Sequence, residues 1–151
     1  MINTRDIDVF WVIQSGQKRS VDLCEAAAQE SRKSFEAHDV SEGGLFVTLC
    51  ESGFNRELGF SVQTKSTVRK DAFLFGEGQS RVVVTVTIDR VHDFENFMND
   101  FPCEKIGVVS TGEIVVDGDF WGTIDWWKEK YDSSIENYLS KEEAGSALSS
   151  L

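Results

Sequence analysis

The sequence is poor in proline and cysteine: it has one proline, Pro102, and three cysteines among 151 residues. With so little proline and 40% hydrophobic residues, it belongs to the globular rather than the disordered class. Cys24, Cys50 and Cys103 are far apart and form no CxxC pair, which argues against a disulfide framework and a zinc site. Cys24 and Cys50 fall on apolar helix faces, so we expect buried thiols there.

Basic residues and long apolar runs are also scarce. The chain has 15 Lys and Arg against 26 Asp and Glu, a formal net charge of −11. Binding to a phosphate backbone needs clustered Lys and Arg, so nucleic acid is not an expected partner. No apolar run approaches the roughly 20 residues that span a bilayer, so no membrane partner is expected. The N-terminus lacks the pattern of a secretory signal, and we expect a cytoplasmic protein.

The length suits one ordinary domain. We expect a single domain over residues 1–139 and a frayed, small and polar tail over residues 140–151. Residues 1–16 contain the apolar run Val9–Ile13, which predicts either an edge strand or a segment that packs on another domain. The chain therefore has enough apolar residues for a core without needing disulfide bonds or a metal.

Helices and strands alternate in the first half of the predicted fold. Ser20 is a candidate N-cap for a helix with apolar positions from Val21 to Phe35. Residues 35–40 read as a short extended stretch and Leu45–Phe54 as a second helix. Residues 58–63 alternate like a half-buried strand. The first half thus follows the order helix, strand, helix, strand.

The second half contains more strands than helices. Arg81–Ile88 reads as a central buried strand because its valines run almost without interruption. Asp89 is expected to cap a helix that ends at Pro102. Two strands, 105–110 and 113–117, are predicted to form a hairpin, followed by a turn at Asp117-Gly118 and a last helix that Thr123 caps. The inward positions of the two helices are predicted to be Val91, Phe94, Phe97, Met98 and Phe101, and then Ile124, Trp127, Tyr131, Ile135, Tyr138 and Leu139. We therefore predict an α+β fold, a mixed sheet between helices in three α/β/α layers.

Two glycines follow a strand that ends in a carboxylate. Asp39 ends the predicted strand, Ser41 can cap the next helix, and Gly43 and Gly44 open it. Backbone N–H groups at a positive helix end, with no side chains to block them, can hold a phosphate, and Asp39 can ligate a magnesium ion. The alternative is structural, because many such glycine pairs only let a helix pack closely on a sheet. Both interpretations stay open on these residues alone.

A second polar segment precedes the valine strand. Residues 71–81 place Glu77 and Gln79 on a glycine-flanked turn, with Arg81 at the strand entry. These three side chains can bind an amide or ribose hydroxyls together with a phosphate. The alternative is a polar loop in which a contact between Glu77 and Arg81 only fixes the strand.

Together the two segments carry a family resemblance. His38–Leu45 (HDVSEGGL) and then Phe73–Val84 (FLFGEGQSRVVV) resemble the C-terminal domain of the aminoimidazole ribonucleotide synthetase superfamily. Within it they are most similar to the last domain of the formylglycinamide ribonucleotide amidotransferase (phosphoribosylformylglycinamidine synthase) family. Supporting matches are Leu58-Gly59-Phe60 and Ile106–Val109. The resemblance runs from about Val21 to about Tyr138.

This resemblance implies a place in a purine-biosynthetic ligase and a partly ferredoxin-like fold. The family converts formylglycinamide ribonucleotide, ATP and glutamine-derived ammonia to the amidine, ADP and phosphate. Its catalytic histidine and most ATP-binding groups lie in N-terminal domains, so the isolated chain is expected to hold no catalytic residue and to be inactive. ATP or ADP and Mg²⁺ are implied for the full-length enzyme. The implied partners are the remaining synthetase domains and a glutaminase domain or subunit.

The family's motifs also imply a set of binding residues. In its first repeat, the corresponding strand-end Asp binds magnesium and a Glu-Ser-Gln turn binds substrate. This chain resembles the second repeat, where Asp39 and Glu77-Gly78-Gln79 match those positions and Gly78 replaces the Ser. Because the family carries a non-catalytic nucleotide site on this side, the resemblance implies an auxiliary phosphate site with Asp39 as its metal ligand. The residues implied for the phosphate are Ser41, Gly43, Gly44, Glu77, Gln79 and Arg81.

Two other functions remain as alternatives. One is an ATPase of the same superfamily, of the thiamine-phosphate kinase or selenophosphate synthetase type, although the turn at residues 75–81 favours the amidotransferase. The other is a freestanding non-catalytic interaction module. His38 should face away from Asp39, as strand neighbours do, and we expect a structural histidine. Trp121, Trp126 and Trp127 are expected to form core or a domain interface.

Overall fold

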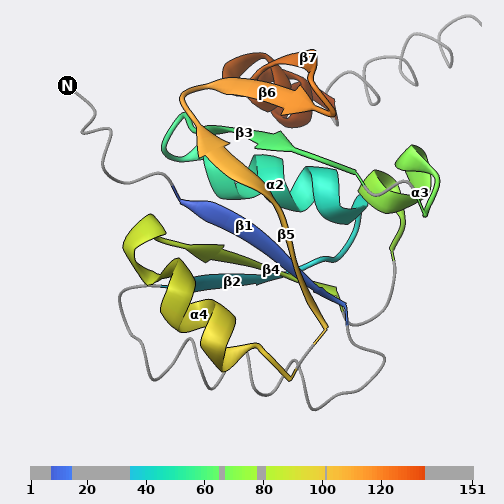
Figure 1. Ribbon diagram of the computed structural model, residues 1–151. Coiled ribbons are helices and arrows are strands. Elements are labelled where there is room, and N and C mark those ends of the chain that lie inside the picture. The colour runs from blue at the N-terminus through green and yellow to red at the C-terminus, as the bar shows by residue number, and fades with distance from the viewer. Residues whose placement is uncertain (1–7, 15–34, 65–66, 78–80, 101, 135–151) are drawn as a thin grey trace, which may run out of the picture.

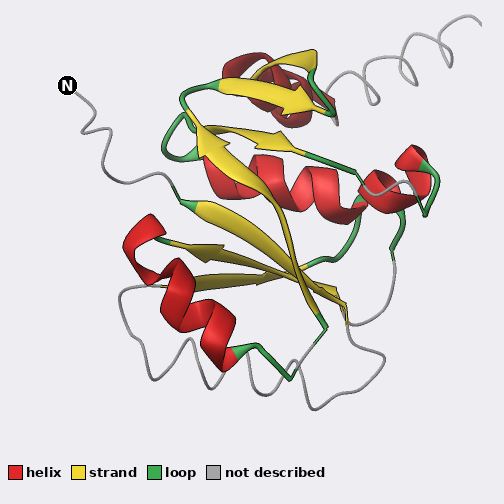
Figure 2. Ribbon diagram, viewed as in Figure 1, coloured by secondary structure: helices red, strands yellow, loops and turns green. Residues whose placement is uncertain are grey.

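A single mixed sheet organises the chain (Figure 1). The computed structural model describes residues 8–14, 35–64, 67–77, 81–100 and 102–134. Its seven strands lie in the order β2-β4-β1-β5-β3-β6-β7, with helices on both faces (Figure 2). The three-layer α+β prediction is confirmed. The elements are β1 (Val9–Gln14), β2 (Phe35–Asp39), α2 (Gly44–Phe54), β3 (Gly59–Val62), α3 (Lys70–Phe75), β4 (Arg81–Val86), the 3-10 turn η1 (Ile88–Arg90), α4 (Val91–Phe97), β5 (Cys103–Ser110), β6 (Glu113–Val116), β7 (Asp119–Thr123) and a helix over residues 124–134.

The strand β1 lies inside the sheet and not at its edge. It pairs antiparallel with β4 on one side and with β5 on the other. Its odd-numbered residues pack on the α4 side and its even-numbered residues on the α2 side, so all five residues of Val9–Ile13 are buried. The expected edge strand or interface segment at residues 1–16 is therefore wrong for this stretch. A continuous apolar run suits a strand covered on both faces.

The predicted hairpin between β5 and β6 is also wrong. The strand β3 lies between them, antiparallel to β5 and parallel to β6. The hairpin lies one turn later, where β6 pairs with β7 through Asp117 (φ 54°) and Gly118 (φ 87°). Two consecutive residues with positive φ suit the twist of a tight two-residue hairpin. The turn at these two residues is as predicted, whereas β7 was not foreseen.

Each face of the sheet carries its own hydrophobic core. On one face α2 packs against the sheet, and the ring of Phe46 lies 5.7 Å from that of Phe60 and 4.9 Å from that of Trp127. On the other face, Phe94 of α4 packs against Trp11 at 5.4 Å between ring centroids. Cys50 is buried on α2, and this burial, followed by the nearby Glu51 carboxylate, raises the pKa of its thiol to about 12. The expected buried thiol is confirmed.

The helix α4 is shorter and less buried than predicted. Phe94 and Met98 are buried, but Phe97 is 44% exposed, and the N-cap residue is Arg90 rather than Asp89. No side chain caps this helix. Val91 is partly buried against the same core, so Val91, Phe94 and Met98 form the inward stripe as predicted, and Phe97 falls outside that stripe. Phe101 falls outside the described residues.

Several predictions reach beyond the residues that the structure describes. The helix expected after Ser20, with Cys24, falls on residues 15–34, which are not among the described residues. Of its expected positions only Phe35 is described, and it begins β2. At the other end, the Thr123 hydroxyl accepts a hydrogen bond from the N–H of Trp126 at 3.4 Å, as predicted for a cap. Ile124 is buried and Tyr131 is 49% exposed. Ile135, Tyr138, Leu139 and the tail over 140–151 are not among the described residues.

Candidate functional site

The two glycines between β2 and α2 adopt left-handed backbone conformations. Gly43 has φ 81° and is the N-cap of α2, and Gly44 has φ 72°. The predicted side-chain cap from Ser41 is not present, because the backbone oxygen of Ser41 accepts the N–H of Gly44 at 3.1 Å instead. Glycine adopts such conformations without the steric strain that a Cβ atom adds. The turn is therefore built from backbone, and its side chains leave the helix end uncovered.

The carboxylate of Glu77 meets this helix end. Its Oε1 accepts a hydrogen bond from the N–H of Gly43 at 3.3 Å, at an exposed position and across 34 residues of sequence. A carboxylate there faces the positive end of α2, where a phosphate oxygen would also be stabilised. The two polar segments predicted from the sequence thus converge, but the protein's own carboxylate occupies the anion position.

Gly44 has a packing role besides its conformation. A Cβ at this position would lie 2.7 Å from the carbonyl carbon of Phe75 and 2.8 Å from the oxygen of Leu74, both in the backbone at the end of α3. Backbone atoms cannot move away as a flexible side chain can. The glycine therefore lets α2 approach α3 closely. This supports the interpretation that the glycine pair serves close packing, although the helix packs here on α3 and not on the sheet.

Arg81 is a buried cation bound to α3. It is 4% exposed, its Nη1 donates to the carbonyls of Phe73 at 3.0 Å and of Gly76 at 3.4 Å, and its guanidinium lies 5.2 Å from the Phe73 ring. Burial lowers the pKa of Arg81. A cation near the last carbonyls of a helix is electrostatically favoured. Arg81 thereby fixes α3 and β4, and its expected contact with Glu77 is replaced by the contact of Glu77 with Gly43.

Asp39 lies on the other side of the sheet. It pairs with Val82, which packs on the α4 side, whereas Glu77 meets the α2 end. Residues opposite one another on paired strands point to the same face, so the Asp39 side chain is directed away from Glu77. Over the described parts of the chain, no group of three or more His, Cys, Asp or Glu could hold a metal ion. Gln79 is not among the described residues.

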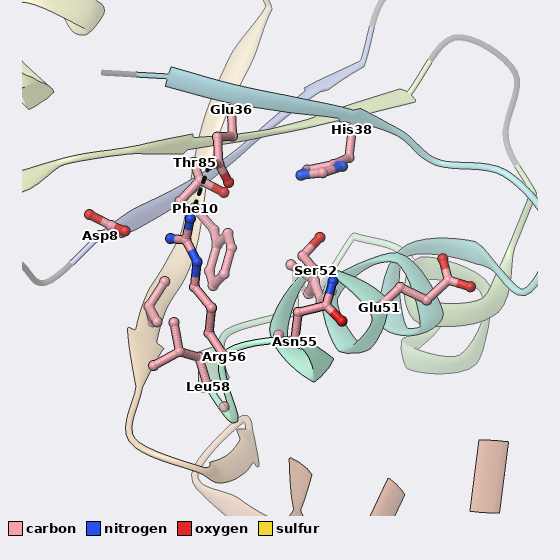
Figure 3. A pocket seen from close by; sticks show the side chains of 14 residues that line it. Asp8, Phe10, Glu36, His38, Glu51, Ser52, Asn55, Arg56, Leu58 and Thr85 are labelled. Atoms are coloured by element: carbon pink, nitrogen blue, oxygen red, sulfur yellow. Dashed lines mark ion pairs between the residues drawn. The ribbon is translucent and has the colours of Figure 1, made fainter. Parts of the chain in front are cut away.

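The opposite end of α2 opens on a pocket with polar and apolar lining that the sequence did not reveal. It has a volume of about 240 Å³ and lies between the C-terminal turn of α2 and the strands β1, β2 and β4 (Figure 3). Glu36 and His38 of β2 point into it, and Arg56 lies across it with Nη2 3.8 Å from Glu36 Oε1. His38 thus faces away from Asp39, as predicted. Two polar residues at alternate positions of a strand, both facing a helix, were the signal that was missed.

The position of the tryptophans agrees with a core or interface role. Trp121 and Trp127 are partly buried against the core beside α2, and Trp127 Nε1 donates to the Trp121 carbonyl at 2.9 Å. Trp126 is 48% exposed. No described helix is long and apolar enough to cross a bilayer.

A match to a known family over most of the chain identifies the family to which the chain belongs. Residues 16–118, which contain both glycine segments, match the family described as AIR synthase related protein, C-terminal domain. The chain belongs to this family. The AIR synthase related C-terminal domain therefore accounts for β2, the Gly43-Gly44 turn, α2 and the strand that follows Glu77.

Curated proteins similar to this chain include PurL subunits. The chain is 35% identical over 83 residues to "Phosphoribosylformylglycinamidine synthase subunit PurL" of Caldanaerobacter subterraneus subsp. tengcongensis, which covers 54% of the chain and 11% of that protein. It is 42% identical over 82 residues to the same subunit of Salinibacter ruber, with 52% and 11% covered. The alignments thus cover about a tenth of the length of these relatives. Within its family, the chain is a domain of the PurL type.

Solved structures share the fold. "T. maritima PurL complexed with FGAR" superimposes with a TM-score of 0.65 at 12% identity over 81% of this chain and 28% of that one. "T. maritima PurL complexed with ATP" gives 0.61 at 15%, over 80% and 25%. "Hydrogenase Maturation Protein HypE in complex with ATP" gives 0.56 at 13%, over 72% and 47%. At these identities the likeness is one of fold alone.

Proposed function

We propose that this chain is the C-terminal domain of a PurL-type synthetase. The whole enzyme would convert formylglycinamide ribonucleotide, ATP and glutamine-derived ammonia to formylglycinamidine ribonucleotide, ADP and phosphate. Its partners would be the remaining synthetase domains and a glutaminase domain or subunit, in the cytoplasm. By itself the domain would be inactive, with a bracing or auxiliary nucleotide-binding role.

The observation that carries this proposal is the contact between Gly43 and Glu77. It joins, within the family match, the two segments on which the similarity to the ligase depends. The same contact favours bracing over nucleotide binding, because the Glu77 carboxylate already satisfies the N–H of Gly43 and would repel a phosphate. A phosphate could bind beside the Glu77 carboxylate only if a cation bridged the two. Asp39, the candidate ligand for such a cation, has its side chain directed to the other face of the sheet.

Membership in the ligase is tested by supplying the domain in trans. A PurL-type synthetase truncated before its last domain is mixed with the chain, and ammonia-dependent formation of the amidine is measured. We expect the chain alone to be inactive and the mixture to recover activity. A mixture that neither associates nor recovers activity, with both proteins folded, would contradict the proposal.

The bracing role is tested separately by calorimetric titration with ADP and Mg²⁺. We expect millimolar or absent binding to the wild-type chain, since the carboxylate of Glu77 holds the anion position. Glu77→Gln removes that charge and should strengthen any binding at the end of α2, whereas Asp39→Ala should have no effect. Micromolar binding that Asp39→Ala weakens would instead establish a working metal and phosphate site and overturn the bracing role.

The alternatives differ in what they predict for the same mixture. A fragment of a HypE-like or other superfamily ATPase would not restore amidine formation, and the curated matches to PurL subunits favour the ligase over it. A freestanding interaction module would not associate with the truncated synthetase. The fold likeness to HypE has no matching similarity among the curated relatives named above.

A further inference from the structure

The residues that line the pocket at the C-terminal end of α2 are more acidic than basic. They include Asp8, Glu36 and Glu51 against one arginine, Arg56, and the Glu51 carboxylate also accepts a hydrogen bond from the Tyr131 hydroxyl at 2.6 Å. The chain as a whole is also acidic, with a formal net charge of −11. Because several carboxylates around one small cavity create a negative potential, the pocket is suited to a cation and disfavours an anion.

The helix adds to this potential. The carbonyl groups of its last turn carry the negative end of the α2 macrodipole, and Ser52, Gly53 and Asn55 of that end line the pocket. The last turn of α2 has no basic residue, and the nearest one in the sequence is Arg56, which follows the C-cap Asn55 and donates its backbone N–H to the Gly53 carbonyl at 3.1 Å. The helix end is independent of the carboxylates, yet both favour the same sign of ligand.

The pocket is small and partly apolar. Its volume of about 240 Å³ is below the roughly 300–1,000 Å³ of pockets that hold drug-sized ligands. The ring of Phe10 forms part of its floor beside the Arg56 side chain, and the imidazole of His38 faces it from β2 (Figure 3). Aromatic rings stabilise flat organic cations through their electron-rich faces. A ligand would therefore be one small ring or short chain with a single cationic group.

Arg56 already occupies the pocket in the way that such a cation would. Its Nη2 lies 3.8 Å from Glu36 Oε1, and both side chains are largely exposed, at 69% and 63%. An ion pair this long and this solvated is weak, so another cation can replace it with little loss of stability. The guanidinium shows where a positive group fits.

We propose that this pocket binds a small organic cation, an amidine, guanidine or amine with a short apolar body, which takes the place of the Arg56 guanidinium beside Glu36 and lies against Phe10. This site is separate from the Gly43 end of α2, and the inference does not depend on nucleotide binding there. Its ligand class follows from the carboxylates and the helix end together.

The test uses three probes of equal shape and different charge. Benzamidine is a cation, benzamide is its neutral counterpart and benzoate is the anion, and each is titrated into the full chain by calorimetry. We expect benzamidine to bind more tightly than benzamide and benzoate not to bind. Equal binding of all three probes, tighter binding of benzoate, or no binding of benzamidine would each overturn the proposal.

Two substitutions test whether Arg56 competes with benzamidine for Glu36 or only changes the net charge of the protein. Arg56→Met removes the internal cation and should tighten benzamidine binding about two- to five-fold, whereas Glu36→Gln should weaken it by a similar factor, the range expected for one exposed ion pair. Arg90→Met is the control, because it makes the same change in net charge on an exposed arginine that is not among the residues lining the pocket. If Arg56→Met weakens binding, or acts no differently from Arg90→Met, Arg56 is not a stand-in for the ligand. Circular dichroism of each variant verifies that it is folded.

Discussion

The two ends of α2 differ in packing and in charge. At the N-terminal end, Gly44 touches the backbone of α3 and the Glu77 carboxylate accepts the N–H of Gly43, so the end is packed and its charge is balanced. At the C-terminal end, the helix faces a pocket of about 240 Å³ lined by carboxylates and has no basic residue in its last turn. One end is closed by the protein itself, and the other is open to a ligand.

This difference shows that a sequence motif typical of ligand sites and an open pocket need not lie at the same end of a helix. The glycine pair is typical of phosphate sites because it leaves backbone N–H groups uncovered. In this chain a carboxylate from a distant turn meets one of those groups, so the motif serves tertiary structure. The open end bears no recognisable motif, because Glu36, His38 and Arg56 become neighbours only when β2 and the end of α2 come together.

The largest expected effect is at Gly44. Gly44→Ala should lower the free energy of unfolding by roughly 2–5 kcal/mol, because it adds a positive-φ strain and places a Cβ against the backbone of α3. Gly118→Ala is the matched control, with φ 87° and no atom within 4 Å of the added Cβ. It should lose only about 1 kcal/mol, from the backbone strain alone.

Urea unfolding of both variants, followed by circular dichroism, gives the comparison. The excess loss in Gly44→Ala over Gly118→Ala measures the contact between α2 and α3. Equal losses in the two variants would mean that α3 yields to the added methyl group, and the N-terminal end of α2 would then not be closed by packing.

A smaller effect is expected from the charge on Glu77. Glu77→Gln should lower the free energy of unfolding by about 1 kcal/mol or less, the range of helix-end interactions at exposed positions. Arg56→Ala at the open end should change it by less than about 0.5 kcal/mol, because its ion pair is long and solvated. Glu129→Gln, an exposed position in the last helix, controls for the change in net charge.

Thermal unfolding at low ionic strength is the appropriate measurement, since added salt should reduce the effect of Glu77→Gln. A loss for Arg56→Ala as large as that for Glu77→Gln would remove the contrast between the two ends. It would show that the protein depends on both contacts alike.

How far the sequence predicts this molecule depends on the range of the interactions involved. The helix α2, the buried run of β4 and the turn at Asp117-Gly118 follow from local patterns, and the structure has them. The central position of β1 and the insertion of β3 between β5 and β6 depend on pairing between distant strands, which no local pattern encodes. An apolar run such as Val9–Ile13 indicates burial on two faces, which is why the prediction of an edge strand or an interface segment is wrong there.

The candidate site divides in the same way. The sequence brought Gly43 and Glu77 together through a family resemblance, and the structure joins them. It could not show that Asp39 faces the other side, although strand alternation with Ala37, which packs on the α4 side, fixes that direction once β2 is paired. Arg81 was expected in a ligand site, but it is buried against α3. The apolar segment before Gly76 did not predict this helix.

A pH-dependent effect should come from the contacts that hold the start of α3. Asp117 of the β6–β7 turn accepts hydrogen bonds from the backbone N–H of Thr64 at 2.6 Å and from its hydroxyl at 2.7 Å, and lies 3.1 Å from the Lys70 Nζ. Burial alone would raise the pKa of Asp117, but these hydrogen bonds and Lys70 lower it on balance. Lys70 is the first residue of α3, which closes the N-terminal end of α2.

A carboxyl group whose pKa is lower in the folded protein stabilises it at pH values above the unfolded pKa, near 4, and loses that contribution as the pH falls through the folded pKa. We therefore expect the melting temperature of the wild type to exceed that of Asp117→Asn at pH 7, and the difference to shrink as the pH falls below about 4. Asparagine tolerates the positive φ of this position, so the turn itself should survive. Other carboxyl groups titrate in both proteins and cancel in the difference. A difference that stays constant down to pH 2 would show that the charge of Asp117 does not hold α3, and that packing at Gly44 closes this end of α2 unaided.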